Sequence, residues 1–444
     1  MGLFDRLFGN VVEDEPQPNI KFGRYSDSYK ESSNYDAWDK ALEAFENKEY
    51  LECYRYFFDY LRDIQEENVR FWDKEKDGLE FEIFQGSVKI IGCANAEKVR
   101  AEAKVVRTDA LNISFMRRLI EQNFELKYSR FAIDKDQNIT IVFDTSSLDG
   151  SPYKLYYALK ELATRADKHD DLLLDEFRNL QAVEIDHLET LPQQEKEVKY
   201  QFLVNEVQSV LHEIDNGKLD KDQYPGGVAY ILLSAIYKLD FLVVPEGYMM
   251  EMLERIHREY FNQDGKNTIQ KNQALCKELR KLLERPSNDF YKEMYRVKST
   301  FGITTPVNHD RIVSFIDNNL NNMDWYKENG YEVIALSIPS YIVGYCLFNY
   351  AVPRATRDFF LLYFQVIERN YFNDLGFTLK FWDAKNRRLN KKGIKKGIDK
   401  VVDKNKAQFN KLNPVVATLD FDSITSFAKS YLLMIRNLDM TKVE

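Results

Sequence analysis

The sequence is poor in the residues that build metal sites and disulfide frameworks. Its 444 residues include four cysteines and five histidines. The cysteines lie far apart without a CxxC pair, which argues against a zinc module and against a disulfide framework, and no two histidines share helical spacing. We therefore predict neither a metal nor a cofactor. We expect four reduced thiols in the core, namely Cys53, Cys93, Cys276 and Cys346.

The common catalytic and ligand-binding signatures are missing as well. Gly265-Lys266 is followed by Asn267, so the phosphate-binding GxxxxGK[ST] pattern fails. Asp134, Asp136 and Asn138 open like a calcium loop, but Ile139 stands where that loop needs glycine, so a hairpin turn is predicted instead. The sequence therefore predicts no enzyme and nominates no catalytic residue.

The N-terminus lacks the long apolar region of a secretory signal, so we expect a cytoplasmic protein. A short amphipathic pattern places four apolar residues on one face, with Asp5 and Arg6 off it. This face predicts docking on a membrane surface or a partner. The alternative is a terminal helix that packs on its own domain or frays. The four residues are Leu3, Phe4, Leu7 and Phe8.

One stretch, Val333 to Pro353, carries no charge and is long enough to cross a membrane. It contains Pro339 between Ser337 and Ser340, and it is rich in Val, Ile, Tyr and Phe. These features favour a buried β-hairpin over a membrane span.

The composition is that of a folded protein with several domains. Hydrophobic residues make up 44%, Tyr and Phe number 27 and 30, and the net charge is −9. Residues 1–34 form the amphipathic segment and a polar tether. Residues 35–69 show helical periodicity in two halves, which predicts a helical hairpin.

After the hairpin the pattern alternates with period two over Asp77 to Val106, which predicts three antiparallel strands with one wet face. A helix over 112–124 follows, with Phe115, Leu119 and Phe124 on one side, and then two strands over 126–133 and 139–143. Ser151-Pro152 begins a long helix, since serine caps a helix and proline fits its first turn. A first domain over 35–178 is predicted.

This order of elements, together with the run LDGSPYKLYYALKELATRAD, resembles the type III secretion chaperone-like fold, including its YbjN-type relatives, over about residues 38–177. The resemblance implies a non-enzymatic module that dimerises or captures a peptide along its sheet or helices. For such capture we nominate four aromatic residues, for which a place in the core is the alternative. They are Tyr128, Phe131, Tyr153 and Tyr157.

The rest of the chain divides near two boundaries. Residues 199–304 read as helices throughout, and residues 305–444 predict a C-terminal α+β domain with strands over 377–382 and 415–421. That order of elements faintly echoes the first domain, so a degenerate second copy is one hypothesis. The fold class predicted for the whole chain is α+β.

A basic segment interrupts the acidic balance. Residues 380–411 hold 12 Lys or Arg against three Asp, a local charge of +9 that leaves −18 elsewhere. Phe381 and Trp382 at its edge suggest binding of RNA, single-stranded DNA or anionic lipid. The alternative is a solvated helix around Ile394 and Ile398. The candidate residues are Arg387, Arg388, Lys391, Lys392, Lys395 and Lys396.

Together these patterns predict a non-enzymatic, chaperone- or adaptor-like interaction protein. Its partner would be another protein or a second copy of this chain. A membrane-surface assembly component and a polyanion binder are the alternatives.

Overall fold

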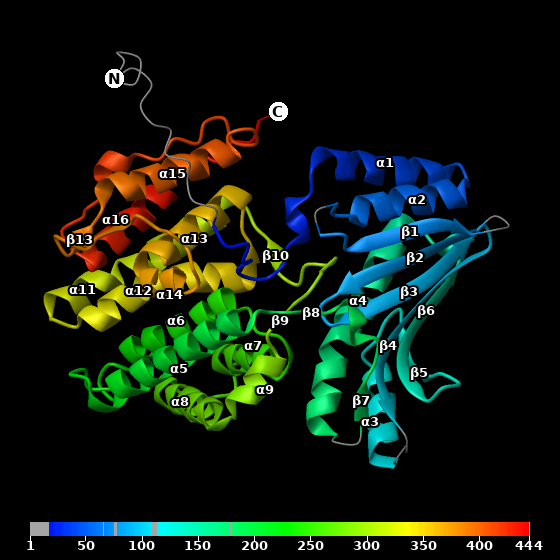
Figure 1. Ribbon diagram of the computed structural model, residues 1–444, viewed down its shortest axis with the longest axis horizontal. Coiled ribbons are helices and arrows are strands. Elements are labelled where there is room, and N and C mark those ends of the chain that lie inside the picture. The colour runs from blue at the N-terminus through cyan, green and yellow to red at the C-terminus, as the bar shows by residue number, and fades with distance from the viewer. Residues whose placement is uncertain (1–16, 65, 75–77, 109–112, 178–179, 444) are drawn as a thin grey trace, which may run out of the picture.

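The computed structural model describes residues 17–443 except 65, 75–77, 109–112 and 178–179. Figure 1 shows two lobes, a sheet lobe built from residues 32–182 and a helical lobe built from residues 193–438. The α+β class, the N-terminal helix pair and the helical middle are confirmed.

The sheet lobe contains an antiparallel sheet of order β1-β2-β3-β4-β6-β5, with the short β7 paired to β4. The three predicted strands are confirmed, and β1 is an addition that the sequence pattern did not indicate. The elements are α1 (Ser32–Glu46), α2 (Tyr50–Leu61), β1 (Val69–Lys74), β2 (Gly78–Gln85), β3 (Val88–Asn95), β4 (Lys98–Thr108), α3 (Ile113–Asn123), β5 (Arg130–Ile133), β6 (Asn138–Ser146), α4 (Pro152–Glu176) and β7 (Leu180–Ala182).

One face of this sheet is covered by α2 and α4. Alternate residues of β2, namely Leu79, Phe81 and Ile83, are buried against these helices. The opposite face carries charged side chains such as Glu80 and Glu82, as period-two alternation predicts for a half-wet sheet.

Two local predictions in this lobe are confirmed. The Ser151 hydroxyl accepts from the Lys154 N–H at 3.3 Å, and Pro152 occupies the first turn of α4. Asp134 Oδ1 accepts from the N–H groups of Asp136 and Asn138, both at 2.8 Å, so this segment is a hairpin turn.

The helices of the other lobe share one hydrophobic core with members from Leu191 to Leu438, so the predicted boundary near residue 305 falls inside that core. They are α5 (Gln193–Asn216), α6 (Pro225–Val243), α7 (Gly247–Phe261), α8 (Thr268–Glu284), α9 (Ser287–Lys292), α10 (His309–Leu320), α11 (Asn322–Glu328), α12 (Glu332–Asn349), α13 (Arg354–Ile367), α14 (Arg369–Asp374), α15 (Lys391–Asn405) and α16 (Ile424–Arg436).

The predicted β-hairpin at Val333 to Pro353 is wrong, because most of that stretch forms α12 with Pro339 inside it. A helix that is mostly buried has no polar face. Its sequence therefore lacks the alternation of apolar and polar residues, with a period of 3.6, by which a helix is recognised. Helix α12 packs against α6, and these two helices are apolar and long enough to span a membrane by composition. In both, however, most of the apolar window is buried inside the helical lobe, 83% for α6 and 72% for α12.

The strands predicted over 377–382 and 415–421 are also wrong. Among the described residues after 304, strands occur only as two-residue pairs, β10 (Thr305–Pro306) with β11 (Tyr350–Ala351) and β12 (Trp382–Asp383) with β13 (Arg388–Leu389). Phe377 and Phe381 are buried in the helical core from an irregular connection. The C-terminal part is helical and does not repeat the sheet lobe.

Residues 17–31 are not the free tether that their polar composition predicted. Phe22 is buried between the rings of Phe372 and Phe377, at centroid distances of 5.1 and 5.9 Å. Gly23 has φ of +72°, and its N–H donates to the Phe241 carbonyl at 2.8 Å. An irregular path between two lobes has no period, so the sequence pattern could not reveal this packing.

Candidate functional site

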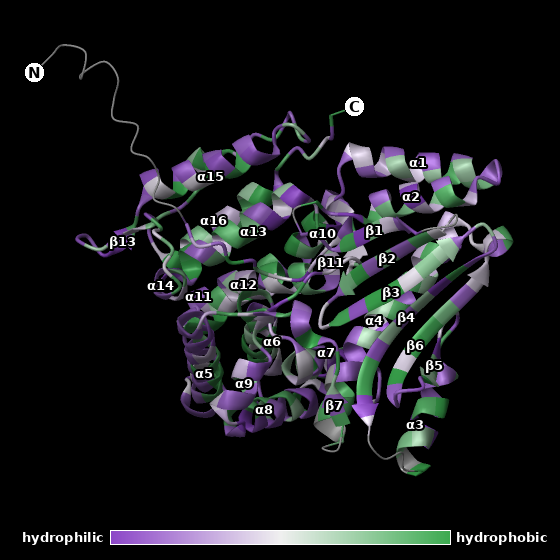
Figure 2. Cartoon of the chain, turned by 45° about the vertical axis from the view of Figure 1, so that its right-hand side comes forward, coloured by the Kyte–Doolittle hydropathy of each residue, from purple (hydrophilic) through white to green (hydrophobic). Residues whose placement is uncertain are grey.

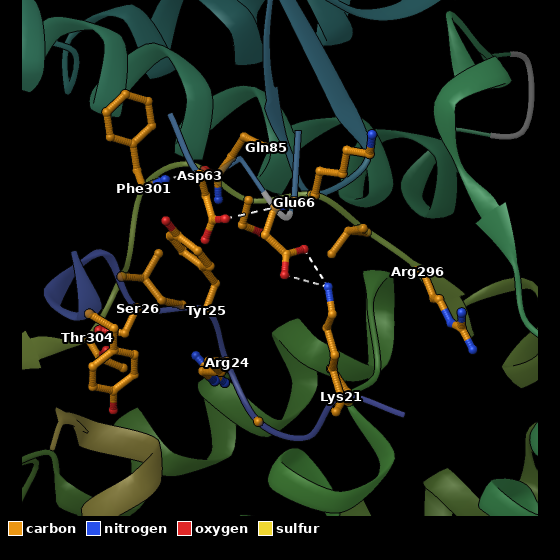
Figure 3. A pocket seen from close by; sticks show the side chains of 18 of the residues that line it. Lys21, Arg24, Tyr25, Ser26, Asp63, Glu66, Gln85, Arg296, Phe301 and Thr304 are labelled. Atoms are coloured by element: carbon orange, nitrogen blue, oxygen red, sulfur yellow. Dashed lines mark hydrogen bonds and ion pairs between the residues drawn. The ribbon is translucent and has the colours of Figure 1, made fainter. Parts of the chain in front are cut away.

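A cleft of about 2050 Å³ lies between the lobes. Its walls come from residues 19–31, the turn at Gly86, α4, α7 and residues 295–304 (Figure 3). Such a junction between lobes is a common place for a ligand site, so its charges decide what it can bind.

Arg24 occupies the middle of the cleft and is nearly buried. Its Nη2 donates to Asp240 at 2.6 Å and its Nη1 to Glu254 at 2.7 Å, while its guanidinium lies 4.3 Å from the Phe348 ring centre. Burial disfavours the charge, but the two carboxylates hold the pKa of Arg24 above its ordinary value. Nε, Nη1 and Nη2 of Arg24 are therefore all bonded to carboxylates of the helical lobe.

Several other charged residues of the cleft form ion pairs with one another. Lys168 pairs with Glu251 at 2.5 Å, and Arg258 reaches the same carboxylate at 2.7 Å. Acidic and basic side chains line the cleft in equal number. The formal charges of the described lining residues therefore balance, and the ion pair between Lys168 and Glu251 joins α4 of one lobe to α7 of the other.

Asp167 has the most shifted carboxyl pKa in the cleft. Burial raises this pKa to about 7, although Asp167 Oδ1 accepts from the Ser87 N–H at 2.8 Å. The Ser87 hydroxyl donates to Asp170 at 2.6 Å, so carboxylates and not an imidazole hold this serine. The cluster fixes the β2–β3 turn against α4 through the two carboxylates of Asp167 and Asp170.

Two histidines near the cleft remain neutral at pH 7. Burial lowers the pKa of His257 to about 4, and its Nδ1 lies 2.8 Å from the Tyr237 hydroxyl. Burial also lowers the pKa of His169 to about 4, and the ring of His169 meets the Phe131 ring edge-on at 5.3 Å. His169 is buried, whereas His257 is partly buried and lines the cleft.

No cluster of three His, Cys, Asp or Glu side chains suited to a metal exists among the described residues. Cys53, Cys276 and Cys346 are buried, and burial raises the pKa of Cys53 to about 12. The expectation of four core thiols is wrong for Cys93, which is exposed because it points to the wet face of β3.

The four aromatic residues nominated for partner binding have different surroundings. Phe131 is buried in the sheet-lobe core, so it is not free to contact a partner. Tyr128 is 39% exposed, and Tyr153 and Tyr157 are each 56% exposed one turn apart on α4. Tyr153 rests edge-on against Trp38, with ring centres 5.0 Å apart.

The exposed apolar residues that the sequence pattern did not indicate lie on α3 and in the turn just after it. Ile113, Ile120 and Phe124 are 89%, 65% and 97% exposed. Phe115 and Leu119 are buried on the other side of the helix, so the prediction that Phe124 shares their face is wrong. At 100° per residue, residues seven or four positions apart lie on the same side of a helix. The spacing of Ile113, Ile120 and Phe124 in the sequence was therefore the signal that could have indicated this apolar side.

Helix α3 runs antiparallel to α4. The rings of Phe115 and Phe177 lie 5.1 Å apart at one end, and Tyr128 donates its N–H to Glu161 at 2.9 Å beyond the other end. Figure 2 shows much of α3 in green at the lower end of the sheet lobe. We name as the α3–α4 strip the exposed residues Ile113, Ile120, Phe124, Tyr128, Tyr153 and Tyr157.

The edge of the sheet next to this strip is closed. Asn123, the last residue of α3, accepts the Phe131 N–H through Oδ1 at 2.6 Å. That N–H points away from β6, where an added strand would need it. The strip therefore offers side chains to a partner and not a free strand edge.

The basic segment does not combine charge with free aromatic faces. Phe381 is buried, and the guanidinium of Arg369 covers Trp382 at 4.1 Å. The candidate basic residues Arg387, Arg388, Lys391, Lys392, Lys395 and Lys396 are all exposed. Of these, Arg388 lies 4.0 Å from Asp383, and the Lys391 ammonium lies 5.1 Å from the Phe421 ring centre.

The candidate docking residues at the N-terminus, Leu3, Phe4, Leu7 and Phe8, lie outside the described residues. Comparison with known proteins assigns no family to the chain: no protein-family model matches it, and no curated protein matches it either. The function is therefore argued from the surfaces themselves.

Proposed function

We propose that this chain is a non-enzymatic protein-interaction module whose sheet lobe binds an apolar helical segment of a partner protein on the α3–α4 strip. The observation that carries the proposal is the exposure of three apolar residues along α3 and the turn that follows it: Ile113, Ile120 and Phe124 are each at least 65% exposed. Large exposed apolar residues gathered in one region mark interaction sites in soluble proteins.

The spacing of the strip favours a helix as its occupant. Ile113 and Ile120 lie about 10 Å apart along α3 at 1.5 Å per residue, which matches two turns of a docked helix. Strand addition at the neighbouring edge conflicts with the Asn123 cap on Phe131. Tyr153 and Tyr157 extend the strip along α4 with rigid aromatic surface.

Ion pairs in the cleft, such as that of Lys168 on α4 with Glu251 on α7, hold the two lobes together. The resemblance to the type III secretion chaperone-like fold agrees with a binding role but stays a prediction. The exposed lysines of α15 do not favour a polyanion as partner, since the nearby rings are covered.

Site-specific photo-crosslinking tests the proposal. A photoreactive phenylalanine analogue replaces Phe124 in one variant and Val333, a 51% exposed apolar residue of the helical lobe, in a matched control. In cells of the source organism, we expect one protein to crosslink at position 124 and not at position 333. In purified form that protein should bind the unmodified chain, and Phe124→Ser should weaken binding about tenfold or more.

Equal labelling at both positions overturns the proposal, as does unchanged affinity of the Phe124→Ser variant. Capture of a second copy of this chain at position 124 contradicts the choice of partner. Circular dichroism melting of each variant separates loss of binding from loss of folding.

A further inference from the structure

Strand β1 forms the other edge of the sheet, and among the described strands it pairs with β2 alone. The Phe84 N–H donates to the Asn68 carbonyl at 2.9 Å, just before β1 begins. Hydrogen-bonded pairs alternate along an antiparallel ladder, so Arg70 and Trp72 bond to β2 while the main-chain groups of Phe71 and Asp73 point outward.

These outward groups are open. Within the part of the chain that the structure describes, no residue forms a hydrogen bond with the main-chain N–H of Phe71 or Asp73. At the opposite edge, Asn123 occupies the corresponding N–H of Phe131. The sheet therefore has one closed edge and one open edge, and an open edge is a template for another strand.

We propose that β1 pairs antiparallel with β1 of a second copy of this chain, across a two-fold axis at Phe71. The inference does not depend on the α3–α4 strip, which lies beside the opposite edge of the sheet.

The side chains select this register. Outward groups occur at odd positions, so the two-fold axis must pass through a residue of β1. An axis at Arg70 places Arg70 opposite itself, and an axis at Trp72 places Arg70 opposite Lys74; both put like charges in contact. An axis at Phe71 avoids these contacts and places Arg70 opposite the Trp72 of the other copy.

Arg70 and Trp72, the two members of that cross-strand pair, both lie on the wet face of the sheet. Trp72 is 45% exposed, and its Nε1 donates to Glu80 at 3.1 Å, which holds the ring on the sheet surface. An arginine opposite a tryptophan gains a cation–π contact. On the other face, Phe71 is half-buried beneath Arg62, whose guanidinium lies 4.4 Å from the ring centre. Pairing would cover the rest of Phe71 and of Trp72.

A proline substitution at the open edge tests the pairing. Asp73→Pro removes an outward N–H without removing any bond between β1 and β2. Asp73→Ala keeps that N–H and removes only the ion pair between Asp73 and Arg55, so it is the matched control. By sedimentation equilibrium, the parent and Asp73→Ala should form dimers, and Asp73→Pro should dissociate at least tenfold more readily.

Disulfide trapping tests the register even where the proline variant fails to fold. In a Cys93→Ser background, Phe71→Cys should form an intermolecular disulfide, since directly opposed hydrogen-bonded residues lie about 5.5 Å apart. Arg70→Cys should not form this disulfide, because with the axis at Phe71 position 70 of one copy faces position 72 of the other and not position 70. A parent that stays monomeric up to about 0.1 mM, or efficient trapping at position 70 but not at 71, overturns the proposal.

Discussion

The Arg24 guanidinium donates to both carboxylate oxygens of Asp240, with Nη2 2.6 Å from Oδ1 and Nε 3.0 Å from Oδ2. Three residues later, Asp27 accepts the hydroxyl of Tyr156, a residue of α4, at 2.6 Å. Residues 24–27 thereby tie the helical lobe to the sheet lobe. This short segment explains why the two lobes hold a fixed cleft between them.

Arg24→Ala should destabilise the protein by about 3 kcal/mol, because it leaves the buried Asp240 carboxylate unpaired. Lys21→Ala is the control: its ion pair with Glu66 is largely exposed on the lysine side, so we expect a loss below about 1 kcal/mol. Urea unfolding measures both. Equal losses would mean that the segment is a tether after all.

Asp167→Asn should change how stability depends on pH. The folded state raises the pKa of Asp167 to about 7, so it retains a proton that the unfolded chain loses near pH 4. This group therefore lowers the unfolding free energy as pH rises from about 4 to about 7, and its effect is constant above that. Asparagine keeps the oxygen that accepts from Ser87 but does not titrate.

The stability of Asp167→Asn relative to the parent should thus grow by on the order of 1–2 kcal/mol between pH 5 and pH 8, since the carboxyl is only partly shielded by the cleft. Paired urea titrations at the two pH values give this difference directly. A difference between variant and parent that does not change with pH contradicts the assignment.

Truncating side chains on the two faces of α3 should change the free energy of unfolding by very different amounts. Leu119→Ala should cost about 2–4 kcal/mol because Leu119 is buried in the core. Ile120→Ala, the adjacent residue on the outer face, should change stability by less than about 0.5 kcal/mol. Thermal or urea unfolding distinguishes them, and a large loss at Ile120 would show that this face is covered.

Polyanion binding by the basic segment should be weak and should depend on charge alone. We expect Lys392→Glu together with Lys395→Glu to abolish any binding of single-stranded RNA, measured by fluorescence anisotropy at low salt. Trp382→Ala should leave that binding unchanged, because Arg369 already covers the ring. A loss on Trp382→Ala equal to that of the charge reversal would restore base stacking as a hypothesis.

Much of the sheet lobe could be predicted from the sequence, because local chemistry determines it there. Period-two alternation located β2 to β4, and Ser151-Pro152 located the start of α4. Helix α12 could not be found this way, since its burial on all sides removes the periodic signal.

The candidate site was only partly accessible to the same reasoning. Tyr128, Tyr153 and Tyr157, which we nominate for the peptide capture that the resemblance implies, are all exposed. Whether an apolar residue such as Phe131 or Phe124 is buried depends on how α3 packs on the sheet, and that packing is a tertiary property. The anchoring of Arg24 likewise depends on residues more than 200 positions away.

The central claim is that the α3–α4 strip binds a partner protein. The most direct test is a calorimetric titration of the protein that crosslinks at position 124 against the parent chain, Phe124→Ser and the matched control Val333→Ser. The account predicts a dissociation constant at least about tenfold higher for Phe124→Ser and unchanged for Val333→Ser. Equal affinity of all three chains would contradict it.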